Sequence, residues 1–349
     1  MQKKVLLIGG AGTLGGATYP ELLKLGFAVD VIALEDFRSV SPQLRFVKAR
    51  ADVPFLEAFF RENPHYDAIV DFIHSRDIEV LKGRADLIMA HTDQYVFLSS
   101  YRTYADTDSI ITEESPKWID VTKDETFLRE DNYAIPKSKG ERYIASTGRK
   151  NWTVIRPLIS FSHYRLDLVT VGGHAILFRP KAGKRLLLPA DCRDKIAGVG
   201  WAGNVGRQIA RLIGNDGALG EAFTLGTGEE ITWGDVASYY AEYAGCEYEW
   251  VSVEDYLEYA TPNTYMDRQM IYTDRLLSRK VDLSKMLRVT GLEKSSFMSC
   301  RDAVAYELAF LSEHPDLVAR FDDAISREID ARTDRYFARD LRGCGHAGA

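Results

Sequence analysis

The sequence predicts an α/β fold in which a doubly wound parallel sheet is followed by a smaller C-terminal α/β cap. Apolar runs typical of buried strands alternate with helical patterns at spacings of about 20 to 30 residues, and the composition changes after residue 165. The chain has 349 residues, 46% hydrophobic and 27% charged, which is enough to bury such a core. We expect a first domain over 1–165, onto which segments near 200–230 pack back, and a cap over 166–349.

The elements of the first domain follow from the apolar pattern. Residues 5–8 form a continuous apolar run that ends at glycines, as expected for a strand covered on both faces. Residues 17–25 then have a helical rhythm closed by Gly26. Further strands are expected at 28–34, 46–47, 68–73, 95–99 and 152–155, and further helices at 53–62, 86–91 and 134–146.

The remainder of the chain is less regular. Residues 103–131 are polar and acidic and contain Pro116, so we expect a long loop rather than a regular element. In the second half, helices are expected at 205–213 and at 233–244, the latter capped by Thr232, with a short strand at 223–225. The tail over 299–339 reads as mostly helical and highly charged.

Charge and composition exclude several classes of function. The formal charge of −7 gives no global field that would attract nucleic acid. No apolar stretch approaches the roughly 18 residues that span a bilayer, and the short apolar run at 5–8 predicts a first strand rather than a signal peptide. We therefore expect a cytoplasmic protein without a nucleic-acid or membrane partner.

Cysteine and histidine spacing gives no indication of a metal site. The four cysteines lie far apart, without disulfide or zinc spacing, and read as free thiols: Cys192, Cys246, Cys300 and Cys344. Three histidines, His74, His163 and His174, likewise lack metal spacing and are assigned no catalytic role. No metal is expected.

The turn after the first strand predicts a dinucleotide site. It reads Gly9-Gly10-Ala11-Gly12-Thr13-Leu14-Gly15 and stands between an apolar strand and a helix. Backbone N–H groups at such a helix N-terminus, where the helix dipole is positive, can bind a pyrophosphate. Gly9, Gly12 and Gly15 are placed at the points of closest approach, and Thr13 and Leu14 complete the turn. The pattern favours a Rossmann-type domain.

The residues at the end of the second strand should indicate whether the site prefers NAD or NADP. An acidic residue there usually accepts the adenosine ribose hydroxyls, whereas an arginine can pair with a 2′-phosphate. Ala33 stands near the place where such an acid is often found, and Glu35, Asp36 and Arg38 follow the end of the strand. Glu35 or Asp36 would serve NAD and Arg38 would serve NADP; we expect NAD and leave NADP open.

A tyrosine and a lysine four residues apart predict a proton-handling pair. Tyrosine has a reference pKa near 10, so it needs nearby positive charge to act as an acid or base at neutral pH. Lys137 lies one helical turn beyond Tyr133, on the same face, and can lower the pKa of Tyr133 and reach the cofactor ribose. The spacing arises often by chance among 18 tyrosines, but this pair begins a helix after the fifth strand.

A hydroxyl at the end of the fifth strand would complete the set. Ser99 and Ser100 follow that strand, and Ser100 is the better candidate for holding a substrate hydroxyl or carbonyl. A serine at a strand end is also common for structural reasons. Its combination with Tyr133 and Lys137 favours the catalytic interpretation.

Together, these motifs resemble the extended short-chain dehydrogenase/reductases, and within them the nucleotide-sugar epimerase/dehydratase branch. The motifs that carry the resemblance are the glycine turn, Phe97-Leu98-Ser99-Ser100, Tyr133-x-x-x-Lys137 and Thr153-Val154-Ile155-Arg156-Pro157. It covers most of residues 3–315. The resemblance implies a tightly held NAD that takes a hydride from a sugar carbon and returns it, a nucleotide-sugar substrate and a homodimer.

Some positions depart from the family pattern. Where the family often has Gly-Asp after the third strand, this chain has Ala49-Arg50, so adenine contact falls to Asp52 or is lost. Tyr101-Arg102 replaces the acid pair of dehydratases, which argues against 4,6-dehydration and leaves Tyr101 as a substrate contact. Arg193 resembles the arginine that binds the substrate pyrophosphate, although a surface ion pair explains it equally well.

Three functions remain open from the sequence. The first is an NAD(P)-dependent epimerase of a nucleotide-linked sugar, with Tyr133 as acid/base, Lys137 lowering its pKa and Ser100 holding the reacting oxygen. The second is a net reductase, dehydrogenase or dehydratase of a sugar or small carbonyl compound, which would use the same residues. The third is a non-catalytic nucleotide- or RNA-binding relative, against which the complete set of Ser100, Tyr133 and Lys137 argues.

Overall fold

The computed structural model describes residues 2–343, which divide into two compact units. The first unit runs to Ser160 and also includes Val199–Gly228 and Val281–Met298; the second comprises Phe161–Gly198, Glu229–Lys280 and the residues from Ser299 on. The sequence assigned residues near 200–230 to the first domain but did not assign 281–298 to it. Cys344 lies outside the described residues.

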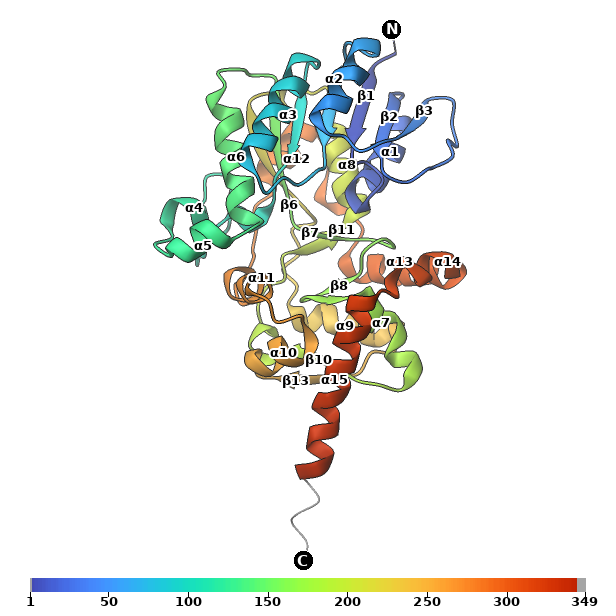
Figure 1. Cartoon of the computed structure of the whole chain (residues 1–349), viewed down its shortest axis with the longest axis vertical. Coiled ribbons are helices and arrows are strands. Elements are labelled where there is room, and N and C mark those ends of the chain that lie inside the picture. Colours follow the sequence, from blue (N-terminus) through green and yellow to red (C-terminus); the bar gives the residue numbers. More distant parts are fainter. Residues whose placement is uncertain (1, 344–349) are drawn as a thin grey trace, which may run out of the picture. The chain divides into compact units, whose positions relative to one another are not determined.

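A seven-stranded, all-parallel sheet forms the centre of the first unit, which confirms the predicted fold class (Figure 1). Its strands are β1 (Lys4–Ile8), β2 (Ala28–Ala33), β3 (Leu44–Lys48), β4 (Ala68–Asp71), β5 (Tyr95–Leu98), β6 (Trp152–Pro157) and β12 (Glu221–Leu225). The spatial order is β12-β6-β5-β4-β1-β2-β3, so the chain reverses direction across the sheet between β1 and β4. In open α/β sheets, ligands bind at the carboxyl ends of the strands beside such a switch point.

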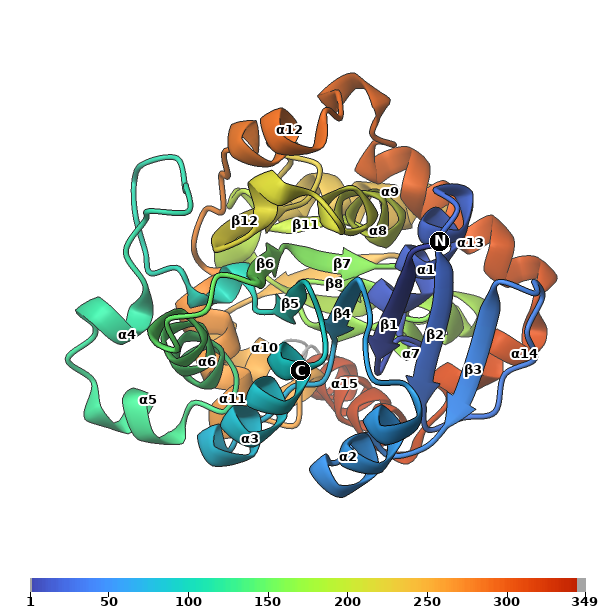
Figure 2. The same cartoon turned by 90° about the horizontal axis from the view of Figure 1, so that it is seen from above.

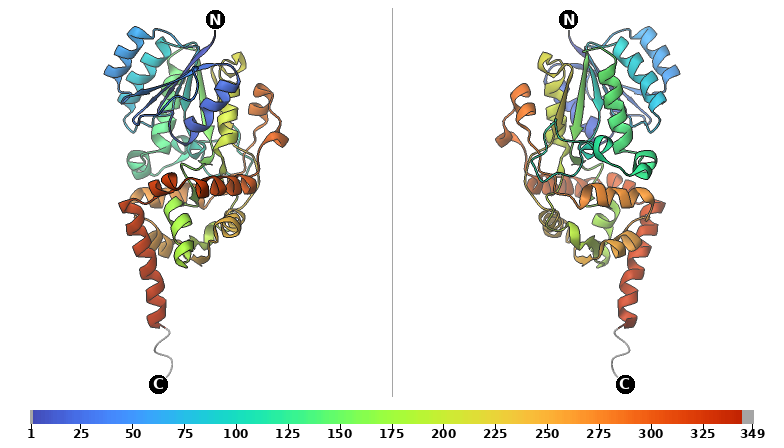
Figure 3. Two further views of the ribbon diagram at one scale, coloured as in Figure 1. Left: turned by 90° about the vertical axis from the view of Figure 1, so that its right-hand side faces the viewer. Right: turned by 90° about the vertical axis from the view of Figure 1, so that its left-hand side faces the viewer.

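Helices cover both faces of this sheet (Figure 2 and Figure 3). The helices of the unit are α1 (Thr13–Lys24), α2 (Val53–Glu62), α3 (Ile78–Ala90), α4 (Trp118–Val121), α5 (Glu125–Glu130), α6 (Ala134–Ser146), α8 (Ala202–Leu212) and α12 (Ser284–Thr290), with 3-10 turns η1 (Tyr101–Thr103), η4 (Asp216–Ala218) and η6 (Lys294–Ser296). Leu22, Ile209 and Met286 of α1, α8 and α12 pack in one core, and Phe60 and Ile88 of α2 and α3 pack in the other. The strands are buried between these two layers.

Close backbone contact between α1 and α8 depends on a glycine. A Cβ atom at Gly206 would lie only 2.4 Å from the carbonyl oxygen of Ala17. The two helices can therefore pack this closely only because Gly206 has no side chain. This contact fixes α1, and with it the glycine turn that precedes α1.

The predicted long loop over 103–131 is only partly irregular, since it contains the short helices α4 and α5. The Asp124 carboxylate accepts a hydrogen bond from the backbone N–H of Phe127 at 3.0 Å and caps α5. The rings of Trp118 and Phe127 then pack edge to face, with centroids 5.9 Å apart. A local cap and one aromatic contact stabilise helices too short to produce an apolar rhythm in the sequence.

The second unit is mainly helical, with short two-stranded ladders. Its strands are β8 (Asp167–Leu168), β9 (Val171–Gly172), β10 (Leu186–Pro189) and β13 (Tyr248–Val251); β7 (Ile159–Phe161) and β11 (Val199–Trp201) stand where the chain passes between units. Its helices are α7 (Gly173–Phe178), α9 (Trp233–Ala244), α10 (Val253–Ala260), α11 (Tyr265–Met270), α13 (Cys300–Glu313), α14 (Pro315–Val318) and α15 (Ala324–Gly343), with η2 (Pro180–Ala182), η3 (Ala190–Cys192), η5 (Ile271–Arg275) and η7 (Ala319–Phe321). Thr232 caps α9 through a capping box with Asp235, as predicted.

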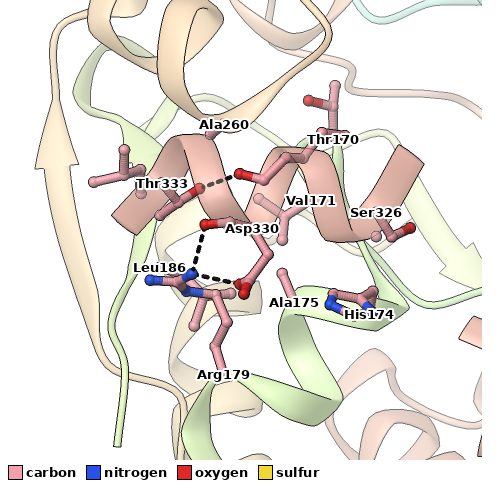
Figure 4. A pocket seen from close by; sticks show the side chains of 13 residues that line it. Thr170, Val171, His174, Ala175, Arg179, Leu186, Ala260, Ser326, Asp330 and Thr333 are labelled. Atoms are coloured by element: carbon pink, nitrogen blue, oxygen red, sulfur yellow. Dashed lines mark hydrogen bonds and ion pairs between the residues drawn. The ribbon is translucent and has the colours of Figure 1, made fainter. Parts of the chain in front are cut away.

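An ion-pair cluster attaches α15 to the rest of the second unit (Figure 4). The buried Arg179 donates hydrogen bonds to the carboxylate and the carbonyl oxygen of Asp330, and Lys184 Nζ lies 2.5 Å from Asp334 Oδ2. These residues border a cavity of about 60 Å³, which accommodates only a few water molecules. The charged tail predicted from the sequence is thus bound to its unit through paired charges.

Candidate active site

The glycine turn has the geometry that a dinucleotide site requires. Gly9 has a positive φ of +70°, which favours glycine. A Cβ at Gly15 would lie 2.3 Å from the carbonyl oxygen of Gly10, and one at Gly10 would lie 2.6 Å from Leu7 Cβ. Gly12 has no atom within 4 Å of its Cβ position and is the N-cap of α1 without a side-chain cap bond. The turn is tightly packed on its inner side and open at Gly12, where the N–H groups of Thr13 and Leu14 begin the helix.

A cavity of about 550 Å³ lies at the carboxyl ends of the central strands. It is lined by Gly9 after β1, Ile32–Leu34 at the end of β2, Ala49–Asp52 after β3 and Ile73–Asp77 after β4. Leu34 and Val80 line it although their side chains are 66% and 51% exposed. The size is within the usual range of a ligand pocket, and the exposed apolar side chains suit a flat aromatic group.

The start of α6 places Tyr133 and Lys137. Asp131 Oδ2 accepts hydrogen bonds from the N–H groups of Tyr133 (3.2 Å) and Ile135 (2.8 Å), which caps the helix. Pro136 lies in the first turn, where a proline removes no helical hydrogen bond. Tyr133 is the N-cap residue and Lys137 follows one turn later, as the sequence predicts.

Lys137 is a buried cation at the end of β5. Its side chain donates a hydrogen bond to the carbonyl oxygen of Leu98, the last residue of that strand, and only 2% of it is exposed. Burial lowers the pKa of Lys137 to about 8, against the opposing attraction of Asp71. The ammonium group is therefore mostly charged at pH 7, and it connects α6 to the segment that carries Ser100.

Arg102 connects Ser100 with Tyr133. Ser100 is the N-cap of η1, and its Oγ accepts a hydrogen bond from the backbone N–H of Arg102 at 3.2 Å. The Arg102 guanidinium lies over the Tyr133 ring, 4.9 Å from its centroid. The structure thus brings Ser100, Tyr133 and Lys137 to one region at the end of β5.

His74 is a neighbour of Tyr133 that the sequence analysis set aside. The two rings pack with centroids 5.2 Å apart, and His74 Nε2 lies 2.7 Å from the carbonyl oxygen of Asn132. Since a carbonyl oxygen only accepts, Nε2 carries the proton of this bond. Burial, followed by the charge of Lys137, lowers the pKa of His74, which favours the neutral ring. Because His74 also lines the cavity, the cavity and the Tyr133 region adjoin.

A buried ion cluster supports the lysine from one turn further along α6. Glu141, four residues after Lys137, accepts hydrogen bonds from Ser99 Oγ, from Lys117 Nζ and from the guanidinium of Arg156. Burial alone would raise the pKa of Glu141, but Arg156 and Lys117 hold it below its ordinary value. The cluster joins β5, α6 and β6. The i, i+4 spacing from Lys137 is the feature of the sequence that could have revealed Glu141.

The remaining predicted residues lie in different places. Asp52 lines the cavity, whereas Glu35, Asp36 and Arg38 are exposed in the loop after β2 and are not among its lining residues. Tyr101 is buried in η1, with 1% of its surface exposed. Arg193 belongs to the second unit, where its guanidinium lies 5.6 Å from the centroid of the Trp250 ring. These assignments stay predictions.

Other expected features have the following places in the structure. Cys192, Cys246 and Cys300 are buried free thiols, and burial raises the pKa of Cys192 to about 12. Within residues 2–343, no group of three or more metal-binding side chains comes together. No helix in that range has the length and apolar character needed to cross a membrane.

The fold is shared with solved structures that include an epimerase and two proteins in complex with NAD. This chain superposes on the epimerase Mth375 of Methanothermobacter thermautotrophicus with a TM-score of 0.67 at 16% sequence identity. The superposition covers 91% of this chain and 95% of Mth375. WbmG of Bordetella bronchiseptica, in complex with NAD and UDP, gives 0.66 at 17% identity, with 90% and 95% covered. MoeE5, in complex with UDP-glucuronic acid and NAD, gives 0.64 at 15% identity, with 89% and 99% covered. No family model and no curated protein matches the sequence.

Proposed function

We propose that this protein is an NAD(P)-dependent enzyme that epimerises a nucleotide-linked sugar by removing a hydride from a sugar carbon and returning it. One contact carries the proposal. His74 lines the cavity at the glycine turn and packs against Tyr133, so a dinucleotide in that cavity would end beside Tyr133 and Lys137.

The cavity suits a nicotinamide dinucleotide. The turn leaves open space at Gly12, where a pyrophosphate can approach the N–H groups of Thr13 and Leu14 and the positive end of α1. Gly9 and Gly15 permit the tight turn, and Asp52 lies among the residues that would surround the adenosine half. When bound, the nicotinamide ring accepts and returns the hydride.

The chain's own residues would move the accompanying proton. Tyr133 would be the acid/base: its phenolate oxygen would take the proton of a substrate hydroxyl and later return it. The Lys137 ammonium and the Arg102 guanidinium lie in the same region of the site. The Ser100 hydroxyl would hold the reacting oxygen. The proposal is supported by WbmG and MoeE5, solved structures of the same fold that hold NAD together with UDP or a UDP-sugar.

The substrate contacts, the assembly and the location are parts of the same proposal. Arg193 would bind the diphosphate of the substrate, because a guanidinium can bind phosphate through two parallel hydrogen bonds. Tyr101 would contact the sugar only after a shift that exposes its side chain. We propose a cytoplasmic homodimer with a small-molecule substrate.

Native mass spectrometry of the freshly purified protein, followed by a panel of UDP-, GDP-, CDP- and dTDP-sugars, tests the function. We expect retained nicotinamide cofactor, a mass shift with one nucleotide sugar and an epimerised product. Tyr133→Phe should lower turnover at least about 100-fold. Tyr143→Phe, in the same helix but hydrogen-bonded to Asp86 at the surface, should leave it unchanged.

The outcomes separate the alternatives. Consumption of NAD(P)H in step with product formation would identify a net reductase that uses the same residues. A protein that binds neither nicotinamide cofactor, and whose turnover survives Tyr133→Phe, would contradict the proposal.

A further inference from the structure

The two carboxylates that line the cavity are engaged as helix caps. Asp52 Oδ1 accepts a hydrogen bond from the N–H of Phe55 at 3.0 Å, at the start of α2. Asp77 Oδ1 accepts one from the N–H of Glu79 at 2.8 Å, at the start of α3. Each carboxylate therefore already stabilises a helix N-terminus. The backbone N–H group uses one of its acceptor sites, and the positive end of the helix dipole partly compensates its negative charge.

Two arginines in the same cavity have no such partner. The side chains of Arg50 and Arg76 line it, are exposed, and form no hydrogen bond or ion pair with any residue between 2 and 343. The third arginine there, Arg84, differs because it is buried and binds the Asp71 carboxylate at 2.8 Å. The cavity thus presents two uncommitted guanidinium groups.

Arg50 stands where a dinucleotide site recognises the adenosine ribose. The N–H of Ala49 donates to the carbonyl oxygen of Ala33 at 2.8 Å, so Arg50 follows directly on the contact between β3 and the end of β2. At the end of β2 the cavity is lined by Ala33 and Leu34, without a carboxylate. An acid at this place accepts ribose hydroxyls, whereas an arginine suits a 2′-phosphate.

We propose that Arg50 and Arg76 form a phosphate site at the adenosine end of the cavity, so that the protein binds NADP(H) as well as NAD(H). A guanidinium presents paired N–H donors that match phosphate oxygens. Arg50 reaches the phosphate from the β3 side and Arg76 from the loop between β4 and α3. The site rests on the proposed function, and it gives Arg50 and Arg76 the phosphate-binding role for which the sequence offered Arg38.

Calorimetric titration with NADPH and NADH, after any retained nucleotide has been removed from the protein, tests the site without a substrate. In the wild-type protein, NADPH should bind at least as tightly as NADH, and raising the salt concentration should weaken NADPH binding more. Arg50→Gln and Arg76→Gln should each lower NADPH affinity about tenfold or more and change NADH affinity less than about twofold. Arg211→Gln, which is exposed on α8 and lies outside the cavity lining, is the matched control and should change neither affinity.

Each other outcome overturns a specific statement. NADPH binding at least about tenfold weaker than NADH in the wild type would overturn the phosphate site, and so would a normal NADPH affinity in both variants. Equal loss of both nucleotides would mean that the arginines contact the base or the pyrophosphate instead. Binding of neither nucleotide to the wild type would overturn the proposed function and this site together. Both arginines are exposed, so thermal unfolding should confirm that the variants fold normally.

Discussion

Lys137 donates a hydrogen bond from its buried ammonium group to the carbonyl oxygen of Leu98. This contact joins the first turn of α6 to the end of β5 and places a cation beside the segment that carries Ser100. Burial lowers the pKa of Lys137 from 10.5 to about 8, so the protein stabilises this charge less well than water does. A residue kept at such an energetic cost is expected to serve chemistry rather than stability.

The stability of Lys137→Met should therefore depend on pH. Between pH 8 and 10.5 the unfolded chain holds a proton on Lys137 that the folded chain has lost, so wild-type stability rises with pH there, by up to about 1.4 kcal/mol per unit. Below pH 8 Lys137 is protonated in both states, so the folded protein bears the full cost of burying the charge. We expect Lys137→Met to be at least as stable as the wild type at pH 7, with an advantage that shrinks from pH 8 to 10.5.

Urea unfolding at pH 7, 8, 9 and 10 measures this difference. Lys139→Met is the matched control, because Lys139 is exposed on the same helix and should give a difference independent of pH. A variant at Lys137 that is less stable than the wild type by the same amount at every pH would show that the bond to Leu98 outweighs the desolvation of the charge.

Glu141→Gln should strongly destabilise the protein. The substitution removes the negative charge that pairs with Arg156 and Lys117, and it leaves the buried Arg156 and the partly buried Lys117 without their carboxylate. Breaking a buried ion pair in this way costs about 3 to 5 kcal/mol. Chemical denaturation measures the change, and Glu130→Gln, which is exposed, should stay within about 0.5 kcal/mol of the wild type. A loss below about 1 kcal/mol at Glu141 would mean that water enters the cluster.

Two glycine-to-alanine substitutions in helices should have opposite effects. A Cβ at Gly206 would lie 2.4 Å from the carbonyl oxygen of Ala17, so Gly206→Ala must push α1 and α8 apart, at a cost of about 1 to 3 kcal/mol or more. At Gly83 in α3 the nearest atom is Val53 Cγ2 at 3.9 Å, so Gly83→Ala should stabilise by about 0.5 to 1 kcal/mol. Thermal unfolding compares the two, and equal melting temperatures would contradict the close packing of α1 on α8.

The sequence predicted those helices and strands that are determined by residues close together in the chain. Buried parallel strands give unbroken apolar runs, and α2 and α6 have the predicted bounds, because caps and helical rhythm are set by neighbouring residues. The short helices α4 and α5 were not predicted, since one cap and one aromatic pair hold them. The sequence indicated helix α3 only over its last turns, from residue 86, and in the structure the helix begins at Ile78, where Asp77 caps it.

The site was predictable only where its spacing is local. Tyr133 and Lys137 are one helical turn apart, and Ser100 follows a strand, so these positions can be read from the chain. His74 follows β4 and Arg102 lies in η1, and only the fold reveals their contacts with Tyr133. Glu141 lies one turn beyond Lys137 in α6, so its spacing can be read from the chain, but its bonds to Ser99 and Arg156 cannot. Glu35, Asp36 and Arg38 in the loop after β2 are exposed and are not among the residues that line the cavity, so their assignment to the cofactor stays a prediction.

Two substitutions in the glycine turn should distinguish its role in nucleotide binding from its role in folding. Gly12 has φ −80° and an open Cβ position, so Gly12→Ala should fold with unchanged stability. The added methyl group would stand where a pyrophosphate approaches α1, and NADH affinity should fall about tenfold or more. Gly15→Ala should instead lower stability, because its Cβ would lie 2.3 Å from the Gly10 carbonyl oxygen.

Thermal unfolding without nucleotide and NADH titration, carried out on both variants, distinguish these effects. Gly12→Ala should keep the wild-type melting temperature and lose the increase that bound nucleotide gives the wild type. Gly15→Ala should melt earlier even without nucleotide. If Gly12→Ala bound NADH as tightly as the wild type, the pyrophosphate would not approach the N-terminus of α1. The cofactor would then have to bind in the cavity without contacting the glycine turn from which the dinucleotide site was predicted.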